Sequence, residues 1–235
     1  QLSECQRCGS AALQLGQVRL AALALAELAA LETRAARHAA AAVCWQFCAS
    51  CYQQVSAAAL QAQALAAQVR SLLAAERLDH AIVVAPHAHQ AAAAATAPEL
   101  SAAIDGDFAD YLLEHGHDAD ETRAACMVAV ESAVDAKLRP AGPVLLALAR
   151  MRLAAVTLAD ADALRHWDAG RDAAVQLAAD LRSDVVLRGA LLVQASNATL
   201  ARPLLHARLQ QHAAQDCSSE ALAVLRAVES SDHDT

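Results

Sequence analysis

Two pairs of cysteines have the spacing of zinc ligands. Cys5 and Cys8 are separated by two residues and followed by Gly9, and Cys48 and Cys51 repeat the same spacing farther along the chain. Two thiolates at this spacing, with a glycine that permits a tight turn, resemble half of a structural zinc site. The four thiols therefore predict a zinc site that staples the N-terminal segment to the region after it. The alternative is a terminal cysteine pair that binds no metal.

A third thiol, Cys44, extends the second pair. If residues 44–51 are helical, the steps of four and three residues place Cys44, Cys48 and Cys51 on one face. Three thiols on one face could bind a soft metal such as Cu(I) or help to hold zinc. The simpler interpretation is core packing, because cysteine behaves as a small hydrophobic residue and fits where alanine fits.

Histidines and carboxylates cluster in a second place. His115 and His117 flank Gly116, and Asp118 and Asp120 follow. Imidazole and carboxylate groups can ligate a divalent metal or transfer protons near neutral pH. The two aspartates also stand where a helix N-cap is expected, and a histidine at a helix C-terminus is favoured by the helix dipole. We therefore interpret this cluster as structural.

The remaining motifs of enzyme chemistry are absent from the sequence. It contains no nucleophile triad, phosphate-binding loop or dinucleotide fingerprint, and its seven glycines are scattered. We therefore predict no catalytic residue, no organic cofactor and no enzymatic activity.

The elements that must position these residues are helices. From Gly16 to Pro98 there is no other glycine, and Pro86 is the only proline between them. Alanine is the best helix former, whereas glycine costs about 1 kcal/mol and proline about 3 kcal/mol inside a helix. The sequence thus predicts an all-α fold that begins with a long antiparallel helical hairpin or arm over residues 10–78. The turn is expected near residues 33–38, and one unbroken helix is the alternative.

Three parts are expected along the chain. Residues 1–84 form the cysteine-containing head and the hairpin arm, and residues 85–98, with His87 and His89, form a linker or a loosely held helix rich in alanine, proline and histidine. Residues 99–235 form a multi-helix bundle or solenoid-like domain of seven to eight short helices. No consensus repeat is evident at periods of 33–40 residues.

Helix boundaries follow from capping residues, glycines and prolines. The predicted N-caps are Ser10, Asp107, Asp118 or Asp120, Asp160 and Asp172; the predicted stops are Gly116, Pro140 and Gly170, and Pro143 is expected in a first turn. Further helices are predicted over residues 185–195, 198–214 and 219–229.

Composition narrows the function classes. The net charge of −8 argues against a general nucleic-acid binder, which needs a clustered basic surface. The sequence contains no uncharged stretch of about 18–20 Leu- and Val-rich residues, so we predict no membrane span. Amino acids encoded by AT-rich codons are scarce; for example, Lys137 is the only lysine. This scarcity indicates a GC-rich genome.

The cysteines also bear on the compartment. Their number, seven, is odd, and three are expected on one helix face where they cannot easily pair. This pattern favours an intracellular reducing compartment, the cytosol or an organelle matrix or stroma, over a secreted disulfide framework. The chain begins with Gln1 rather than Met, which indicates a processed product from which a targeting segment has been removed, a fragment, or the ordered part of a longer chain.

These observations favour a non-catalytic helical adaptor or scaffold subunit of a larger assembly, with other protein subunits as partners. The alternative hypothesis is a helical protein that binds zinc or a soft metal through Cys5, Cys8, Cys48 and Cys51, with Cys44 as a further ligand.

Overall fold

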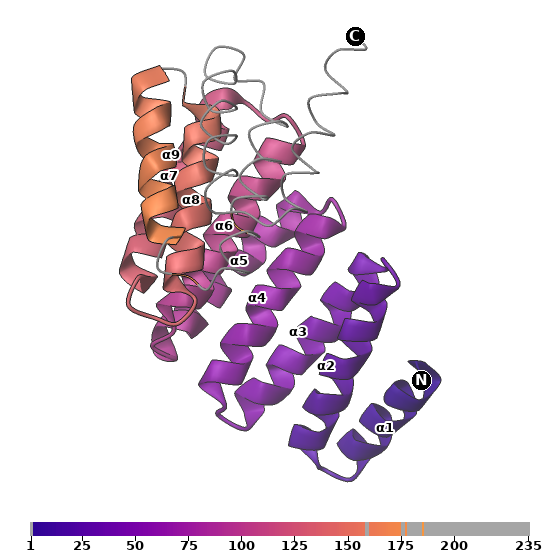
Figure 1. The fold of residues 1–235 in the computed structure, drawn as a ribbon. Coiled ribbons are helices and arrows are strands. Elements are labelled where there is room, and N and C mark those ends of the chain that lie inside the picture. Colours follow the sequence, from indigo (N-terminus) through magenta and orange to yellow (C-terminus); the bar gives the residue numbers. More distant parts are fainter. Residues whose placement is uncertain (1, 158–159, 175–176, 178–184, 186–235) are drawn as a thin grey trace. The chain divides into compact units, whose positions relative to one another are not determined.

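The computed structural model describes residues 2–157, 160–174, 177 and 185. These residues form nine α-helices and no strand, so the predicted all-α class is confirmed for the part of the chain described (Figure 1). The helices are α1 (Leu2–Gln14), α2 (Val18–Arg34), α3 (His38–Gln54), α4 (Ala58–Ala74), α5 (Leu78–Ala94), α6 (Pro98–Glu114), α7 (Ala119–Ala136), α8 (Gly142–Val156) and α9 (Asp160–Ala174).

The first helices are strictly periodic. Each helix from α2 to α6 has 17 residues, and each is separated from the next by a turn whose middle residue has a positive φ. These residues recur every 20 positions: Gly16, Ala36, Ser56, Glu76, Thr96 and Gly116. Helices α2 to α5 therefore run side by side in alternating directions, each packed on its neighbours in sequence (Figure 1).

The turn after α2 shows how the backbone makes this period. The amide of Arg37 donates to the carbonyl of Glu32 at 2.9 Å, and the amide of Ala36 donates to the carbonyl of Thr33 at 2.9 Å. These are the two hydrogen bonds of a Schellman motif, in which the residue after the helix is left-handed. The carbonyl of Arg37 then accepts from the amide of Ala41 at 3.0 Å and so starts α3. Arg37 thus completes the C-terminal motif of α2 through its amide and starts α3 through its carbonyl, and no side chain caps α3.

The predicted hairpin arm is therefore corrected. Residues 10–78 contain the end of α1 and all of α2, α3 and α4, and α5 begins at Leu78. The turn expected near residues 33–38 is present at residues 35–37, but turns at 15–17, 55–57 and 75–77 were missed. The reason is that the left-handed positions of two missed turns are Ser56 and Glu76 rather than glycine. The prediction relied on helix-breaking residues, whereas the backbone turns without them.

Alanine makes the close packing of these helices feasible. Ala21, Ala41 and Ala81 each occupy the fourth position of their helix, and all three are fully buried. A larger cluster joins α1, α2, α3 and α4 and includes Ala12, Ala22, Cys48 and Ala64. Small side chains at such contacts let helix axes approach closely. The core is thus built from alanine with a few larger residues between.

Residues 85–98, which the sequence predicts to be a linker or a loosely held helix, are mostly helical. They form the second half of α5, the turn at residues 95–97 and the first residue of α6. Ala81, Ala85, Ala88 and Ala92 are buried at steps of four and three, so an apolar stripe passes directly through the alanine run. Pro86 is tolerated on the exposed side of this helix.

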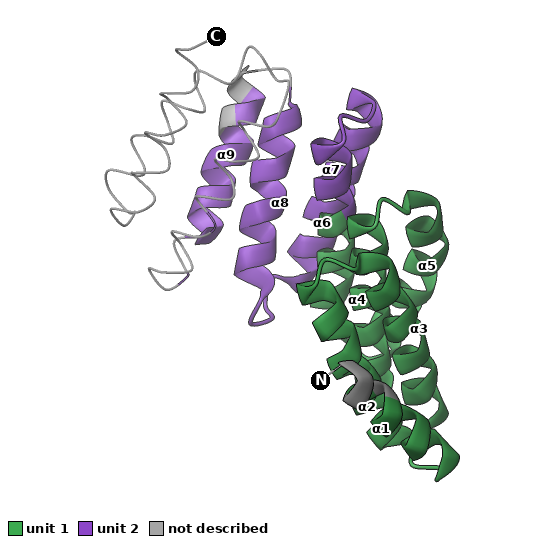
Figure 2. Cartoon of the chain, turned by 90° about the vertical axis from the view of Figure 1, so that its right-hand side faces the viewer, with its two compact units in different colours: residues 1–107 green, residues 108–235 purple. Residues whose placement is uncertain are grey.

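The contacts divide the chain into two compact units within α6. The first unit comprises residues 1–107 and the second residues 108–235 (Figure 2). The division thus falls between Asp107 and Phe108, beyond the predicted linker. Asp107, a predicted N-cap, lies inside α6, as Ser10 lies inside α1.

In the second unit, the described helix boundaries follow the predicted caps in part. Asp118 caps α7, its carboxylate accepting from the amides of Asp120 and Glu121 at 2.9 and 3.1 Å. Pro143 lies in the first turn of α8, as predicted. Predictions for 185–195, 198–214 and 219–229 lie outside the described residues apart from Val185.

Gly170 does not end a helix. Helix α9 continues through it to Ala174, so the predicted new helix at Asp172 is wrong. A Cβ atom at Gly170 would lie 3.0 Å from the carbonyl oxygen of Ala147 and 3.2 Å from Cγ of Met151, both on α8. This glycine therefore permits close packing of α9 on α8 rather than a stop.

Candidate functional site

The structure places the predicted cysteine ligands on two different helices. Cys5 and Cys8 lie on α1, half-buried and exposed respectively, whereas Cys48 and Cys51 are buried on α3. Helix α1 packs on α2, and α2 packs on α3. The Cys48 thiol donates to the carbonyl of Ala22 at 3.4 Å, so it points toward α2. The spacing on α3 is thus that of one helix face, as predicted.

The surroundings of the α3 thiols favour their protonated form. Burial raises the pKa of Cys48 to about 12, and the adjacent Cys51 thiol raises it as well. Burial also raises the pKa values of Cys44 and Cys51. A thiolate is the form that binds metal, and an apolar environment opposes it. These three cysteines fit the packing interpretation.

Within the described residues, no group of three or more histidine, cysteine, aspartate or glutamate side chains is arranged to hold a metal ion. The four thiols of the zinc hypothesis are thus not assembled into one group in this structure. The zinc site remains a prediction that elemental analysis can test.

The histidine cluster has structural contacts. The rings of Tyr111 and His115 stack with their centroids 4.1 Å apart, and Nδ1 of His115 lies 2.9 Å from the carbonyl oxygen of Tyr111. His117 lies 5.7 Å from the Tyr111 ring, centroid to centroid. In the first unit, Nε2 of His89 lies 3.2 Å from a carboxylate oxygen of Asp105. Each contact ties a helix end or a neighbouring helix in place.

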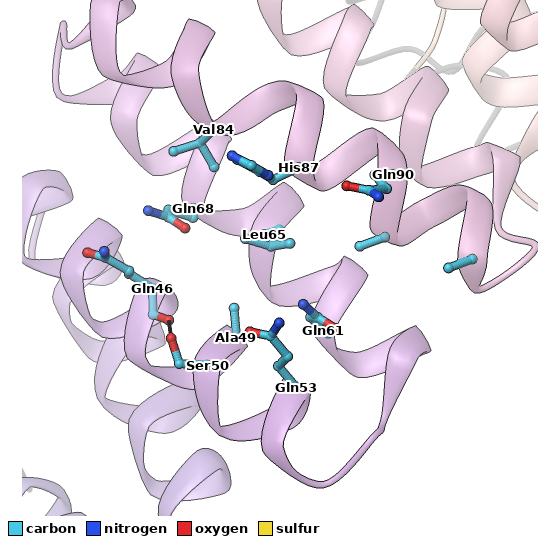
Figure 3. Close-up of a pocket in the computed structure, with 12 residues that line it drawn as sticks. Gln46, Ala49, Ser50, Gln53, Gln61, Leu65, Gln68, Val84, His87 and Gln90 are labelled. Atoms are coloured by element: carbon cyan, nitrogen blue, oxygen red, sulfur yellow. Dashed lines mark hydrogen bonds between the residues drawn. The ribbon is translucent and has the colours of Figure 1, made fainter.

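A groove crosses α3, α4 and α5 (Figure 3). Its volume is about 480 Å³, within the range of small-ligand sites. We call it the glutamine groove. Twelve residues line it: Gln46, Ala49, Ser50 and Gln53 from α3; Gln61, Leu65 and Gln68 from α4; and Val84, His87, Gln90, Ala91 and Ala94 from α5.

Helix periodicity explains why glutamines converge here. Gln46 and Gln53 are seven residues apart on α3, and Gln61 and Gln68 are seven apart on α4. Seven residues are close to two helical turns, so each pair lies on one face. The turn at residues 55–57 brings the two faces together. The sequence-based predictions did not include these glutamines, and the repeated seven-residue spacing is the signal that could have identified the groove.

The amides of the groove lack protein partners. No side-chain hydrogen bond is made by any of its five glutamines in the described structure. Gln46, Gln53 and Gln90 are exposed, so their amides are open to water, and Gln68, although only 7% exposed as a residue, has no amide atom among the buried side-chain atoms that lack a partner (Figure 3). The groove therefore presents solvent-accessible amide donors and acceptors that a ligand can also contact.

The groove is also uncharged. Its described lining contains no aspartate, glutamate, lysine or arginine, and His87 is the only titratable side chain in it. Leu65, Val84 and the alanines supply apolar surface between the amides. The site is suited to a neutral ligand with many hydrogen-bonding groups.

Comparison with known proteins gives no match from which a function could be inferred. The chain matches no protein-family model, no curated protein and no solved structure. None of the described helices is both long and apolar enough to cross a bilayer.

Proposed function

We propose that this protein is a non-catalytic helical adaptor subunit whose first unit binds another protein through the glutamine groove. The observation that carries the proposal is a groove lined by five glutamines on a regular array of helices. Repetitive helical arrays bind partners along surfaces formed by successive helices. Three consecutive helices contribute to this groove.

Exposed apolar side chains on the same unit support a partner-binding role. Leu15, Leu23, Phe47 and Val83 are each more than half exposed. Single exposed apolar residues are common on protein surfaces, and here Leu23 and Phe47 lie on the adjacent helices α2 and α3, where a partner can cover them.

We also propose an intracellular reducing compartment. The six cysteines that the structure describes are all free, and Cys48 and Cys51 are buried as thiols. Free thiols are typical of reducing compartments.

The experiment for the proposed function is native mass spectrometry of the full chain, tagged and purified from its own cells under reducing conditions. We expect the 24.4 kDa chain to be recovered in a larger protein complex of fixed composition. Recovery as a bare monomer at cellular concentration would contradict the adaptor role.

A further inference from the structure

We infer that the second unit carries a binding site for a single phosphate group, formed by basic side chains of three successive helices. The side chains are Arg123 on α7, Arg150 on α8 and His166 on α9, and we call them the basic cluster. This inference goes beyond the adaptor function and does not depend on the glutamine groove, because the cluster and the groove belong to different units.

The cluster is organised around α8, which packs on both α7 and α9 (Figure 2). Nη1 of Arg150 lies 3.4 Å from Nδ1 of His166, so these two side chains meet where α8 contacts α9. The stem of Arg150 is packed as well, because a Cβ atom at Gly170 of α9 would lie 3.1 Å from the Cβ atom of Arg150. Helix α9 therefore contacts Arg150 both at its stem and at its guanidinium group.

This contact sets the hydrogen-bonding roles of the imidazole ring. A guanidinium group carries only donors, so Arg150 donates and Nδ1 of His166 accepts as part of a neutral ring. The ring proton of the neutral imidazole then lies on Nε2, which is a further donor. The cluster thus combines charged donors with one uncharged donor.

Positive charges gather around His166. Burial lowers the pKa of His166, and the charge of Arg150 lowers it further. Arg165 and Arg123 act in the same direction, whereas the carboxylate of Asp162 raises this pKa. Asp162 also forms an ion pair with Arg165, and the two charges offset each other. The charges of Arg123 and Arg150 remain, and both are positive.

Neither Arg123 nor Arg150 forms an ion pair in the part of the chain that the structure describes. By contrast, Arg152 on the same helix as Arg150 donates to both carboxylate oxygens of Asp110, at 2.5 and 2.6 Å. Charge-assisted hydrogen bonds of this kind are roughly twice as strong as neutral ones. The basic cluster therefore offers two guanidinium groups and an imidazole donor to an anion from outside the chain.

The charge of the cluster favours phosphate over other anions. A phosphate monoester carries about 1.5 to 2 negative charges at neutral pH, which two guanidinium groups can balance. A carboxylate carries one charge, and a single arginine satisfies it. A nucleic acid needs basic side chains along several phosphates, and the net charge of this chain is −8. The matching ligand is one phosphate group, either inorganic phosphate or the phosphoserine of a partner protein.

The test is isothermal titration calorimetry of the full chain at constant ionic strength. The probes are inorganic phosphate, a blocked phosphoserine peptide, glutamate and a short single-stranded oligonucleotide. We expect saturable binding of a phosphate probe and at least about tenfold weaker binding of glutamate. Tighter binding of the peptide than of inorganic phosphate would support a phosphoprotein as the source, and the reverse order would support free phosphate. Equal binding of glutamate, tighter binding of the oligonucleotide, or no saturable binding would overturn the inference.

Matched variants locate the binding. Arg150→Gln and Arg123→Gln each remove one charge from the cluster, whereas Arg34→Gln removes the charge of an exposed arginine on α2, in the first unit. We expect each cluster variant to weaken phosphate binding at least about fivefold, and Arg34→Gln to leave it within about twofold. Equal weakening by all three variants would show that overall charge attracts the phosphate, and would overturn the inference.

A second measurement keeps the cluster intact. The chain has ten histidines, so the NMR signals of the His166 ring are assigned by their loss in His166→Gln. A bound phosphate stabilises the imidazolium form, so we expect the pKa of His166 to be higher in phosphate than in chloride at equal ionic strength. An unchanged pKa would overturn the inference. Failure of phosphate binding would leave the adaptor function standing, because that function is tested by recovery of a protein complex.

Discussion

Glycine substitutions at the left-handed turn positions test the 20-residue architecture through the sign of their effect. Ala36, Ser56 and Glu76 are exposed and have φ values of 56°, 54° and 57°. An L-residue in this region costs about 1–2 kcal/mol because its Cβ crowds the backbone. Glycine avoids that cost but loses about 0.5–1 kcal/mol more through the entropy of the unfolded chain.

The expected net gain is about 0–1.5 kcal/mol per site with a middle value of about 0.75 kcal/mol, so the triple variant Ala36→Gly, Ser56→Gly, Glu76→Gly should be stabilised by about 2 kcal/mol. If residues 56 and 76 instead lay inside long helices, each glycine there would cost about 1 kcal/mol. The two architectures thus predict opposite signs.

The assay is urea unfolding of the full chain, followed by circular dichroism. The unfolding free energies of the variants are compared using a common slope of free energy against urea concentration. A matched control is Ala67→Gly inside α4, which should destabilise by about 1 kcal/mol. A triple variant that is less stable than the original chain, by an amount similar to the control per site, would refute the assigned turns.

Four further predictions follow from individual contacts. Arg152 donates to both carboxylate oxygens of Asp110 at 2.5 and 2.6 Å, so Asp110→Asn should lower the free energy of unfolding by about 2–4 kcal/mol in urea titrations, and no measurable loss would show that the pair is dispensable. Because burial raises the pKa of Cys48 to about 12, we expect this thiol to remain unmodified by a disulfide reagent at pH 8 while exposed Cys8 reacts, and equal labelling rates read by mass spectrometry would contradict its burial. The hydrogen bond to Asp105 raises the pKa of His89, so this pair stabilises the fold fully below the unfolded-state pKa and loses that effect as pH rises through the folded-state pKa. We therefore expect His89→Gln to lower the free energy of unfolding more at pH 5.5 than at pH 8. A difference that does not change with pH would count against this pair. Elemental analysis of chain purified without chelators should find less than one equivalent of zinc, whereas one equivalent that is lost in Cys48→Ala would establish the metal-binding alternative.

Much of the helical character could be predicted from sequence because it depends on local preferences. The N-cap at Asp118 and the proline in the first turn of α8 are local signals, and both were read correctly. The stop at Gly170 was misread because a glycine can also serve packing, as it does here between α9 and α8. Telling the two apart requires the neighbouring helix.

The 20-residue period was missed for a different reason. Its turns are made by backbone hydrogen bonds in which one residue, such as Arg37 or Ala57, serves both the ending and the beginning helix. No side-chain cap marks the turns before α2, α3, α4 and α5, and alanine, serine and glutamate stand at positions 36, 56 and 76, where glycine is usual. Tertiary packing of alanine faces offsets the local cost, and this packing cannot be read from residue preferences alone.

The candidate site was only partly accessible from sequence. The glutamines were not among the predicted site residues, and the turn that sets α3 against α4 brings them to one groove. Cysteines and histidines drew attention because their chemistry is familiar. Neutral amides carry no such signal until the helices that bring them together are known.

Site-specific photo-crosslinking in the chain's own cells tests the central claim most directly. A benzophenone side chain placed at Gln90 lies in the groove, and the same group at Gln63 lies on α4 outside it. We predict a defined protein adduct from position 90 and none, or much less, from position 63. Adducts of equal yield from both positions, or none from position 90, would contradict the groove as the partner-binding site.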